Sequence, residues 1–457
     1  MNNNNEKFEF IESMFASISQ IDASRIIGKR ITLYPRGRHH MGLCPFHGDH
    51  KLGSFVVTDG KGNYKCFACG AGGNAIGFVS KYEGKKYLEA AFDIALEEGV
   101  ISQMQYDKYS KKKYDADAVK SLQKKYETQK KGVESKYVNP EVLQNVYTFM
   151  RDYAGINEGH KNHLIKERHL SEERLEKDYF SFPYNRKHKL IEALREKYPE
   201  YSREVLQDIP GFFYNREKSE LTYAGYKGIG ILMRGADGKV RGIQIRRDTV
   251  KEGENRYMWF SSTFALYDRE KYSGGNTIGS PIDVLYPRKM RNNYPICIAE
   301  GRFKTEILAE QGNFAVSVQG VGNFANIDKD ISRIVSVKAY GCKSIYVFYD
   351  ADMLGNIAVF TQCMRLTKYL QERISLSIKV ACWKPELGKG IDDLFLNNGA
   401  DSIKYFSPAE LNSIHQKVLK STLVEFGAER VVDVSEDKRK SFCATLCHRM
   451  EDNLFGI

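Results

Sequence analysis

Two short pairs of metal-binding residues constrain the fold of this chain more than any other feature. Cys44 and His47 form C-P-F-H, Cys66 and Cys69 form C-F-A-C, and eighteen residues separate the two pairs. Zinc binds four soft or borderline ligands at the corners of a tetrahedron, and two pairs on facing turns supply them. Because protein would fill all four positions, the ion would be structural rather than catalytic. The pattern therefore predicts a structural zinc site at these four residues.

The segment between the two pairs predicts a β-hairpin. GSFVVTDGKGNYKCF alternates apolar and polar residues around Asp-Gly and Lys-Gly steps, which are frequent in hairpin turns. We expect cations and aromatic rings to be exposed on this ribbon, a combination that suits single-stranded nucleic acid because bases stack and phosphates pair. A redox role for the second cysteine pair is the alternative, and it leaves the first pair unexplained. The side chains expected to be exposed are Lys51, Phe55, Lys61, Tyr64 and Lys65.

Composition limits the class of protein. The 457 residues suffice for two to four domains, and 69 Lys and Arg against 58 Asp and Glu give a net charge of +11. That surplus favours a polyanionic partner. Nine cysteines in a chain of this length do not make a disulfide scaffold. The segment MNNNNEKFEF does not resemble a signal peptide, and no apolar run approaches the roughly 20 residues that span a bilayer. We expect a cytoplasmic protein with reduced thiols and no membrane partner.

Patterns along the chain predict an α/β multidomain protein. Strand and helix patterns alternate over residues 291–405, which is typical of a parallel α/β sheet. Residues 106–138 contain few aliphatic side chains and many lysines, which indicates a solvated helical or flexible linker. The predicted order is a zinc-binding domain at 1–105, the linker at 106–138, mixed helices and strands at 139–290, the sheet domain at 291–405 and a helical tail at 406–457.

Carboxylates follow two predicted strands of the parallel sheet. PICIAEG predicts a strand that ends at Glu300, and SIYVFYDAD predicts another that ends in Asp350 and Asp352. Ligands of open α/β sheets bind beyond the carboxyl ends of the strands, and the D-x-D spacing matches the strand period of two. Any one of these acids can cap a helix. Together with Asp392 and Asp393 of GKGIDDLF, they predict a Mg²⁺ or Mn²⁺ site suited to phosphoryl transfer.

An ordered set of motifs resembles one enzyme family. E-G-x-x-K/D followed by D-x-D resembles the TOPRIM domain of primases, topoisomerases and some nucleases. With C-P-F-H and C-F-x-C ahead of it, the chain resembles the DnaG-type bacterial primases, which have a CHC2 zinc ribbon. NHLIKERHLSEERLEK, MRGADGKVRGIQIRR and ENRYMWFSS are similar to further motifs of that family, so the resemblance covers about residues 20–400. GNTIGSPIDV and GKGIDDLF are more similar to primases of phages, plasmids and integrative mobile elements than to the housekeeping enzyme.

The resemblance implies a fold, an activity and a set of site residues. It implies a zinc ribbon, an α+β core subdomain at 139–290 and a TOPRIM domain at 291–405. The implied enzyme is a DNA primase that joins ribonucleotides on a single-stranded DNA template with Mg²⁺ or Mn²⁺. Nucleoside triphosphates and the template would be its partners, with a separate replicative helicase as a further candidate. By motif, the metal ligands would be Glu300, Asp350, Asp352, Asp392 and Asp393.

This chain departs from the family pattern at two acidic positions. Lys304 stands where housekeeping relatives often have an acid, and Gly390 stands at the first acid of the motif G-K-D-P-D-E. In the first turn of a helix, Lys304 is suited to pair with a nucleotide phosphate, helped by the positive helix end. The number and affinity of the bound metal ions are therefore open.

Basic residues match the family's nucleic-acid groove. Arg234 and Arg246 occupy positions of basic groove residues, and the strand period places Gln244 on the same face as Arg246. We expect all three to contact nucleotide or DNA. For Arg241 and Arg247, a solvated sheet edge explains the residues as well as binding does.

Two other functions fit parts of the sequence. A TOPRIM nuclease or a topoisomerase-like enzyme would use the same acids, and the 28 tyrosines leave a tyrosine nucleophile open. A non-enzymatic DNA-binding mediator of replication or recombination would use the fold as a scaffold, and the full set of acids argues against it. In the tail, Cys443, Cys447 and His448 suggest either a second metal site or helix packing, and packing is the commoner use.

Overall fold

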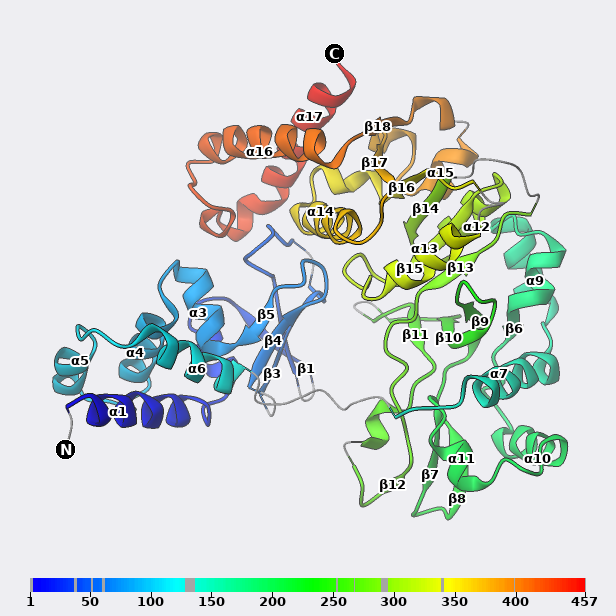
Figure 1. The fold of residues 1–457 in the computed structure, drawn as a ribbon, viewed down its shortest axis with the longest axis horizontal. Coiled ribbons are helices and arrows are strands. Elements are labelled where there is room, and N and C mark those ends of the chain that lie inside the picture. Colours follow the sequence, from blue (N-terminus) through cyan, green and yellow to red (C-terminus); the bar gives the residue numbers. More distant parts are fainter. Residues whose placement is uncertain are drawn as a thin grey trace. The chain divides into compact units, whose positions relative to one another are not determined.

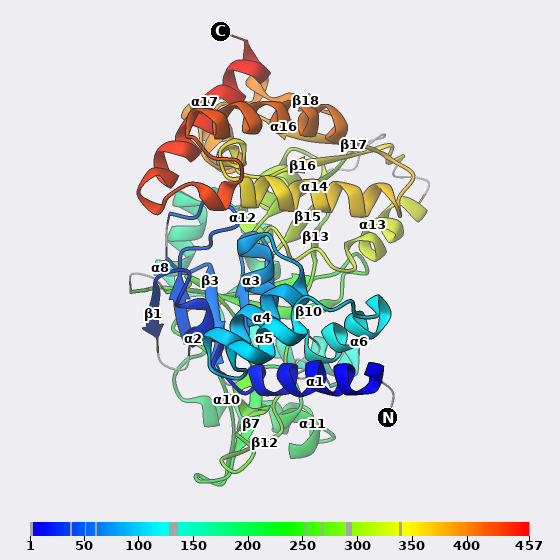
Figure 2. The same cartoon turned by 90° about the vertical axis from the view of Figure 1, so that its left-hand side faces the viewer.

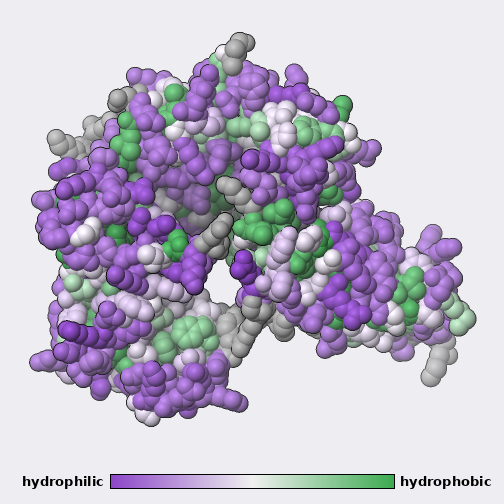
Figure 3. Space-filling model, turned by 180° about the vertical axis from the view of Figure 1, so that it is seen from behind, coloured by the Kyte–Doolittle hydropathy of each residue, from purple (hydrophilic) through white to green (hydrophobic). Residues whose placement is uncertain are grey.

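The chain folds into two compact units, which Figure 1 shows as a ribbon. The first comprises residues 1–131, 352–362 and 412–457, and the second comprises residues 132–351 and 363–411. Among the described residues, no helix is long and apolar enough to cross a membrane. Hydrophilic side chains cover most of the face in Figure 3, and the hydrophobic side chains on it form separate small patches. The computed structural model describes residues 3–36, 39–50, 52–59, 62–127, 136–251, 254–266, 268–288, 295–337, 341–397 and 399–456.

A five-stranded antiparallel sheet forms the centre of the first unit, with its strands in chain order. The predicted hairpin is confirmed: Phe55 pairs with Cys66, and Thr58 pairs with Asn63. This pairing brings the ends of the hairpin together, where two of the four predicted zinc ligands lie. The strands are β1 (Leu33–Arg36), β2 (His39–Gly42), β3 (Phe55–Thr58), β4 (Asn63–Cys66) and β5 (Gly72–Asn74).

Helices cover this sheet because their apolar residues recur at helical spacing. Asn74 caps the first turn of α3 by accepting a hydrogen bond from the Gly77 amide at 2.8 Å. On the same helix Phe78 is fully buried, and its ring meets Tyr64 edge-on with ring centroids 5.2 Å apart. The helices of this layer are α1 (Asn3–Ile18), α2 (Ala23–Ile27), α3 (Ala75–Glu83) and α4 (Tyr87–Glu97).

Part of the predicted linker is helical, which is one of its two predicted forms, and these helices pack on the core of the first unit. Helices α5 (Gln103–Tyr109) and α6 (Ala116–Glu127) pack beside α1 and α4, as Figure 2 shows. Tyr109 stacks on Phe10 with ring centroids 4.0 Å apart, and Leu122 is buried in the same core. The lysine-rich composition concealed a few apolar residues at helical spacing. Because of that spacing, they lie on one face of the helix, and this face packs on the core. Residues 128–135 of the predicted linker lie outside the described residues.

The first half of the second unit contains two small antiparallel sheets. Strand β9 reads GIGILMR and is buried along almost its whole length, because α7 packs on one side and residues of η2 and α9 on the other. The strand orders are β11-β10-β9-β6 and β12-β7-β8. The strands are β6 (Tyr179–Ser181), β7 (Phe212–Asn215), β8 (Glu220–Tyr223), β9 (Gly228–Arg234), β10 (Val240–Arg247), β11 (Tyr257–Trp259) and β12 (Tyr272–Ser273). The helices are α7 (Pro140–Ala154), α8 (Glu158–Asn162), the π-helix η2 (His163–Glu167), α9 (Glu172–Asp178), α10 (Lys187–Lys197) and α11 (Arg203–Gln207).

The predicted parallel α/β sheet is confirmed, with antiparallel strands at its two edges. Its order is β13-β15-β14-β16-β17-β18, and the four central strands run parallel. The strands are β13 (Asp283–Leu285), β14 (Pro295–Glu300), β15 (Phe314–Val318), β16 (Ser344–Phe348), β17 (Ser377–Cys382) and β18 (Lys404–Phe406). The helices of this region are α12 (Arg302–Glu310), α13 (Ile327–Ser336), α14 (Ile357–Gln371) and α15 (Ile391–Leu396).

The tail is helical, as the sequence predicted. It forms α16 (Pro408–Glu425) and α17 (Arg439–Phe455). Within the first unit, the Cys443 thiol donates to the Gly48 carbonyl at 3.5 Å, so α17 packs against the turn that carries the first zinc pair. Cys447 packs close to Gly355, whereas His448 is largely exposed. These cysteines therefore pack between elements, and they belong to no metal-ligand cluster of the described residues.

Candidate zinc centre and carboxylate site

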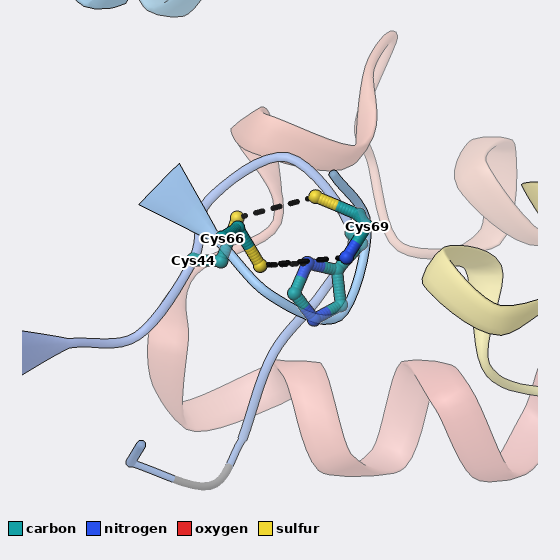
Figure 4. A group of neighbouring side chains, drawn as sticks. Cys44, Cys66 and Cys69 are labelled. Atoms are coloured by element: carbon teal, nitrogen blue, oxygen red, sulfur yellow. Dashed lines mark hydrogen bonds between the residues drawn. The ribbon is translucent and has the colours of Figure 1, made fainter. Parts of the chain in front are cut away.

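The four predicted zinc ligands converge. Cys44 follows β2, His47 lies in the turn after it, Cys66 ends β4 and Cys69 lies in the turn before β5. Their ligand atoms all lie within 4.8 Å of one another. Cys44 Sγ lies 3.8 Å from Cys69 Sγ (Figure 4). Cys66 Sγ lies 3.9 Å from His47 Nδ1. Bonds of about 2.3 Å at tetrahedral angles place two sulfurs about 3.8 Å apart, so the quartet fits a zinc ion.

Polar neighbours orient these ligands. The Cys69 amide donates to Cys66 Sγ at 3.5 Å, as in turns that hold a metal thiolate. Asp49 Oδ2 lies 3.8 Å from His47 Nε2 and accepts from the Ser54 hydroxyl at 2.5 Å. A carboxylate behind a histidine ligand fixes the ring and raises its basicity. Hydrogen bonds from the Cys44 and Cys69 thiols hold the pKa of the Cys66 thiol below its usual range, which favours the thiolate that binds metal.

The predicted nucleic-acid face of the ribbon needs correction. Phe55 and Tyr64 are buried, at 0% and 3% exposure, because the strand alternation turns both rings onto α3. They are core residues, so the prediction that their rings are exposed was wrong. Lys65 is exposed as expected, whereas Lys51 and Lys61 lie outside the described residues.

The aromatic ring that the ribbon does expose is one that sequence reasoning missed. Phe67 is 67% exposed and lies between Cys66 and Cys69. A signal was present in the sequence, because Phe67 follows a predicted zinc ligand in the C-F-A-C turn, where no alternating strand pattern turns the ring toward the core. Phe67 and Lys65 therefore provide the combination of ring and cation that the sequence assigned to Tyr64 and its neighbours.

The two acids predicted at strand ends lie at the same edge of the parallel sheet. Glu300 ends β14, and Asp350 follows β16, which pairs with β14 in parallel. Lys304, in the first turn of α12, donates its ammonium to Asp350. Burial lowers the pKa of Lys304, but Asp350, Glu300 and Asp392 outweigh it and raise the pKa above its usual value. The carboxylates suit a hard cation, and a lysine already neutralises one of them.

The remaining predicted acids differ in their surroundings. Asp393 Oδ2 accepts from the Gly390 amide at 3.2 Å, so it caps α15. Asp392 Oδ2 lies 3.8 Å from Arg168 Nη1. Asp352 lies in the short 3₁₀ helix η5 (Ala351–Leu354), two residues along the chain from Asp350. Among the described residues, the zinc quartet is the one group of three or more His, Cys, Asp or Glu side chains gathered tightly enough for a metal.

A buried charge network holds the helix that follows Glu300. Arg302 donates to Asp178 at 2.7 Å, to Asp283 at 2.8 Å and to Glu306 at 2.8 Å. All four side chains are almost completely excluded from solvent. Burial raises the pKa of Asp283 to about 6, although Arg302 opposes the shift. Such a network costs much desolvation, so we attribute to it the fixed position of the strand end rather than a large gain in stability.

The three predicted groove residues separate into two kinds. Arg234 pairs with Asp178 at 2.6 Å, and Gln244 is buried and donates to Gln319 at 3.0 Å, so both have partners within the protein. Arg246 differs, because its Nε atom is buried without a hydrogen-bond partner. It lines a cavity of about 490 Å³ together with His163, Lys227 and other residues of α8 and η2. Sequence reasoning assigned no role to His163, although it lies in the family-like stretch NHLIKERHLSEERLEK.

Two segments of the chain are similar to known protein families. Residues 8–113 match the family model for the CHC2 zinc finger of DnaG, and residues 288–402 match a domain of unknown function, DUF3854. The DNA primase of Synechocystis is 47% identical over 76 residues, which are 17% of this chain and 12% of that protein. Residues 8–113 are thus similar to the CHC2 zinc ribbon of DnaG-type primases. That part of the sequence prediction is confirmed.

The similarity extends beyond the ribbon in some relatives. The DNA primase of Haemophilus influenzae is 24% identical over 373 residues, covering 79% of this chain and 55% of that protein. The chain thus spans about half or less of the length of these curated relatives. A crystal structure of the Aquifex aeolicus primase, with its zinc-binding and RNA polymerase domains, aligns with 97% of this chain and 99% of that one, at 18% identity and a TM-score of 0.40.

Proposed function

We propose that this protein is a DNA primase that makes short RNA primers on single-stranded DNA by metal-dependent nucleotidyl transfer. The observation that carries the proposal is the position of Glu300 and Asp350 at the carboxyl ends of two paired parallel strands, in a chain that also carries a CHC2 ribbon. On this proposal the sheet at 291–405 acts as a TOPRIM domain of the kind in primases of phages, plasmids and integrative mobile elements. The enzyme would work in the cytoplasm with nucleoside triphosphates, a DNA template and a separate replicative helicase.

The proposed metal ligands are Glu300, Asp350 and Asp352, with Asp392 nearby in the motif that follows. A divalent ion held there would stabilise charge on the nucleotide phosphates and activate the primer hydroxyl. Lys304 is placed to contribute a further positive charge beside the same phosphates, because it lies among these acids in the first turn of α12.

A cluster of unpartnered polar atoms supports phosphate binding in the second unit. His163 Nε2, Arg168 Nε and Arg246 Nε are all buried without a hydrogen-bond partner. Burial and the nearby guanidinium of Arg246 lower the pKa of His163, which favours the neutral ring. Its Nδ1 donates to Glu167 Oε2 at 2.7 Å, so Nε2 of the neutral ring is an acceptor and does not bind a phosphate oxygen. A buried donor without a partner costs about 1–3 kcal/mol, which a phosphate oxygen would recover at the Nε–H groups of Arg168 and Arg246. We assign these two arginines to the nucleotide or template backbone.

The ribbon supplies the proposed template grip. Lys65 and Phe67 are exposed beside the zinc ligands, so a phosphate and a base can engage neighbouring side chains. Lys61, which lies outside the described residues, is retained as a candidate from the sequence alone. Arg234 and Gln244 would act indirectly, since their partners Asp178 and Gln319 belong to the same unit.

The test is a template-dependent synthesis assay with the full chain. The zinc-loaded protein is incubated with a library of single-stranded DNA templates, labelled ribonucleotides and Mg²⁺ or Mn²⁺, and short products are resolved by length. We expect primers from wild type, none from Asp350→Ala or Glu300→Ala, and wild-type yields from Asp401→Ala, which removes an exposed acid of the same sheet domain. Wild-type product from Asp350→Ala would overturn the proposal. Cleavage of the template without synthesis would identify a nuclease instead.

A further inference from the structure

Lys304 occupies the space among the proposed metal ligands. Its ammonium donates to Asp350, and Glu300 and Asp392 are near enough to act on its charge. The side chains of Lys304 and Asp350 are mostly buried, at 20% and 15% exposure. Two-metal sites hold their ions about 3.5–4 Å apart between shared carboxylates. Here a lysine lies in that space, within the described part of the site.

Gly390 makes room for this lysine. A Cβ atom at position 390 would lie 2.9 Å from Lys304 Cε and 2.3 Å from Asp392 Oδ1. The backbone of Gly390 is extended, with φ −96° and ψ 167°, so its conformation does not require glycine. Space is therefore the reason for glycine at this position. The two departures from the family's acidic pattern, at 304 and 390, meet in one place.

Lys304 and Gly390 also make the site more positive, which disfavours a second divalent ion. Where the family pattern has two acids, this chain has one cation and one residue without a side chain, which makes the site more positive by three charges. Repulsion between an ammonium and a divalent ion is strong at short range in a partly buried site. A second divalent ion would have to displace Lys304 from Asp350 before it could bind.

We propose that the ammonium of Lys304 is a resident cation that takes the place of one divalent ion, so that this carboxylate site binds a single Mg²⁺ or Mn²⁺. The inference rests on the proposed function, because it concerns the metal site assigned there to nucleotidyl transfer. The inference concerns only the number of bound metal ions, and this number can be measured without any primer synthesis.

The experiment counts Mn²⁺ ions on the zinc-loaded full chain. Electron paramagnetic resonance measures free Mn²⁺ during a titration, and sites that persist in Asp350→Ala are subtracted. We expect wild type to bind one ion at the carboxylate site and Lys304→Gln to bind Mn²⁺ at least about tenfold more tightly, because one positive charge is removed. The double variant Lys304→Asp with Gly390→Asp should bind two ions. Lys329→Gln, which removes an exposed lysine on α13, should behave as wild type.

Each outcome decides the inference. Two ions on wild type, or unchanged affinity in folded Lys304→Gln, would overturn it. Zinc content and melting temperature confirm folding, and the wild-type ion count is decisive even where a variant fails to fold. Failure of the proposed function is separate: a protein that makes no primers but binds one Mn²⁺ controlled by Lys304 keeps this inference, whereas an active primase that binds two ions loses it.

Discussion

Arg302 donates to Asp178 across 2.7 Å, and this contact ties the helix that follows Glu300 to the last residue of α9, directly before β6. The second oxygen of Asp178 accepts from Arg234 at 2.6 Å. One buried carboxylate therefore links a residue of the proposed groove strand to the turn that presents a proposed metal ligand. Arg302 keeps the pKa of Asp178 below its usual value in spite of burial, so the link is ionic at neutral pH.

We predict that Asp178→Ala destabilises the second unit by about 3–5 kcal/mol, because it leaves two guanidinium groups without this partner. Urea unfolding followed by circular dichroism measures the change. Glu204→Ala is the matched control, since it removes an exposed acid that pairs with Arg203 in the same unit, and we expect no measurable change there. An equally stable Asp178→Ala protein would show that the network is dispensable.

The first unit should lose stability in mild acid through His415. This ring is 1% exposed, stacks on Phe360 with ring centroids 3.6 Å apart, and burial lowers its pKa to about 4. Its pKa when unfolded is near 6.5, so the unfolded state binds the proton first as pH falls. The stability is complete above about pH 6.5, and about 3 kcal/mol is lost as pH falls to about 4.

Thermal melts of the first unit between pH 7.5 and 4.5 test this expectation. His415→Leu should flatten the pH dependence of the melting temperature, whereas His448→Leu, which changes an exposed ring of α17, should retain it. If both variants show the wild-type profile, another group controls the acid sensitivity.

The ribbon hairpin, the parallel sheet and the zinc quartet could be predicted from short stretches of the sequence. The ribbon hairpin follows from a period of two around a turn, and the parallel sheet follows from short apolar runs that end in Glu300 and Asp350. The zinc quartet was predictable because both pairs lie close along the chain. Exposure was harder: a tyrosine suits a surface or a core, and only the packing of α3 places Tyr64 inside.

The long-range ionic contacts were beyond sequence reasoning. Arg302 lies 19 residues from Asp283 and 124 residues from Asp178 along the chain, and no periodicity links them. The same holds for Lys304 and Gly390, whose contact appears only when α12 and the turn before α15 come together. Composition alone gave the wrong environment for α6. Its lysines indicate a solvated helix, but Leu122 and Tyr126 on the same helix are buried in the core.

Loss of one zinc ligand should impair the start of primers more than their extension. We predict that Cys66→Ala releases one zinc ion per chain and unfolds the ribbon locally, because an open site loses the folding free energy of the metal. Starting a primer requires the template to be held without a duplex, so de novo synthesis should fall at least about tenfold relative to extension of an annealed primer. Zinc content and the ratio of the two products are measured on one template.

Cys342→Ala is the matched control, since this cysteine belongs to the second unit and is not a predicted ligand. Equal loss of initiation and extension in Cys66→Ala would mean that the ribbon serves the fold as a whole. Full initiation without zinc would make the ribbon dispensable.

The exposed ring of the ribbon gives the sharpest test of its template contact. Phe67→Ala should leave the fold intact, because the ring is 67% exposed, and should weaken binding to single-stranded DNA by about 1–3 kcal/mol, the contribution of one stacked base. Fluorescence anisotropy with a labelled oligonucleotide measures this loss, which corresponds to about fivefold to more than a hundredfold in Kd. Met104→Ala truncates an exposed apolar side chain of the same unit and should bind DNA as wild type does.

Tyr64→Ala should instead lower the melting temperature of the first unit, because its ring packs against Phe78 in the core. Unchanged affinity for single-stranded DNA in Phe67→Ala would mean that the template binds elsewhere on the protein.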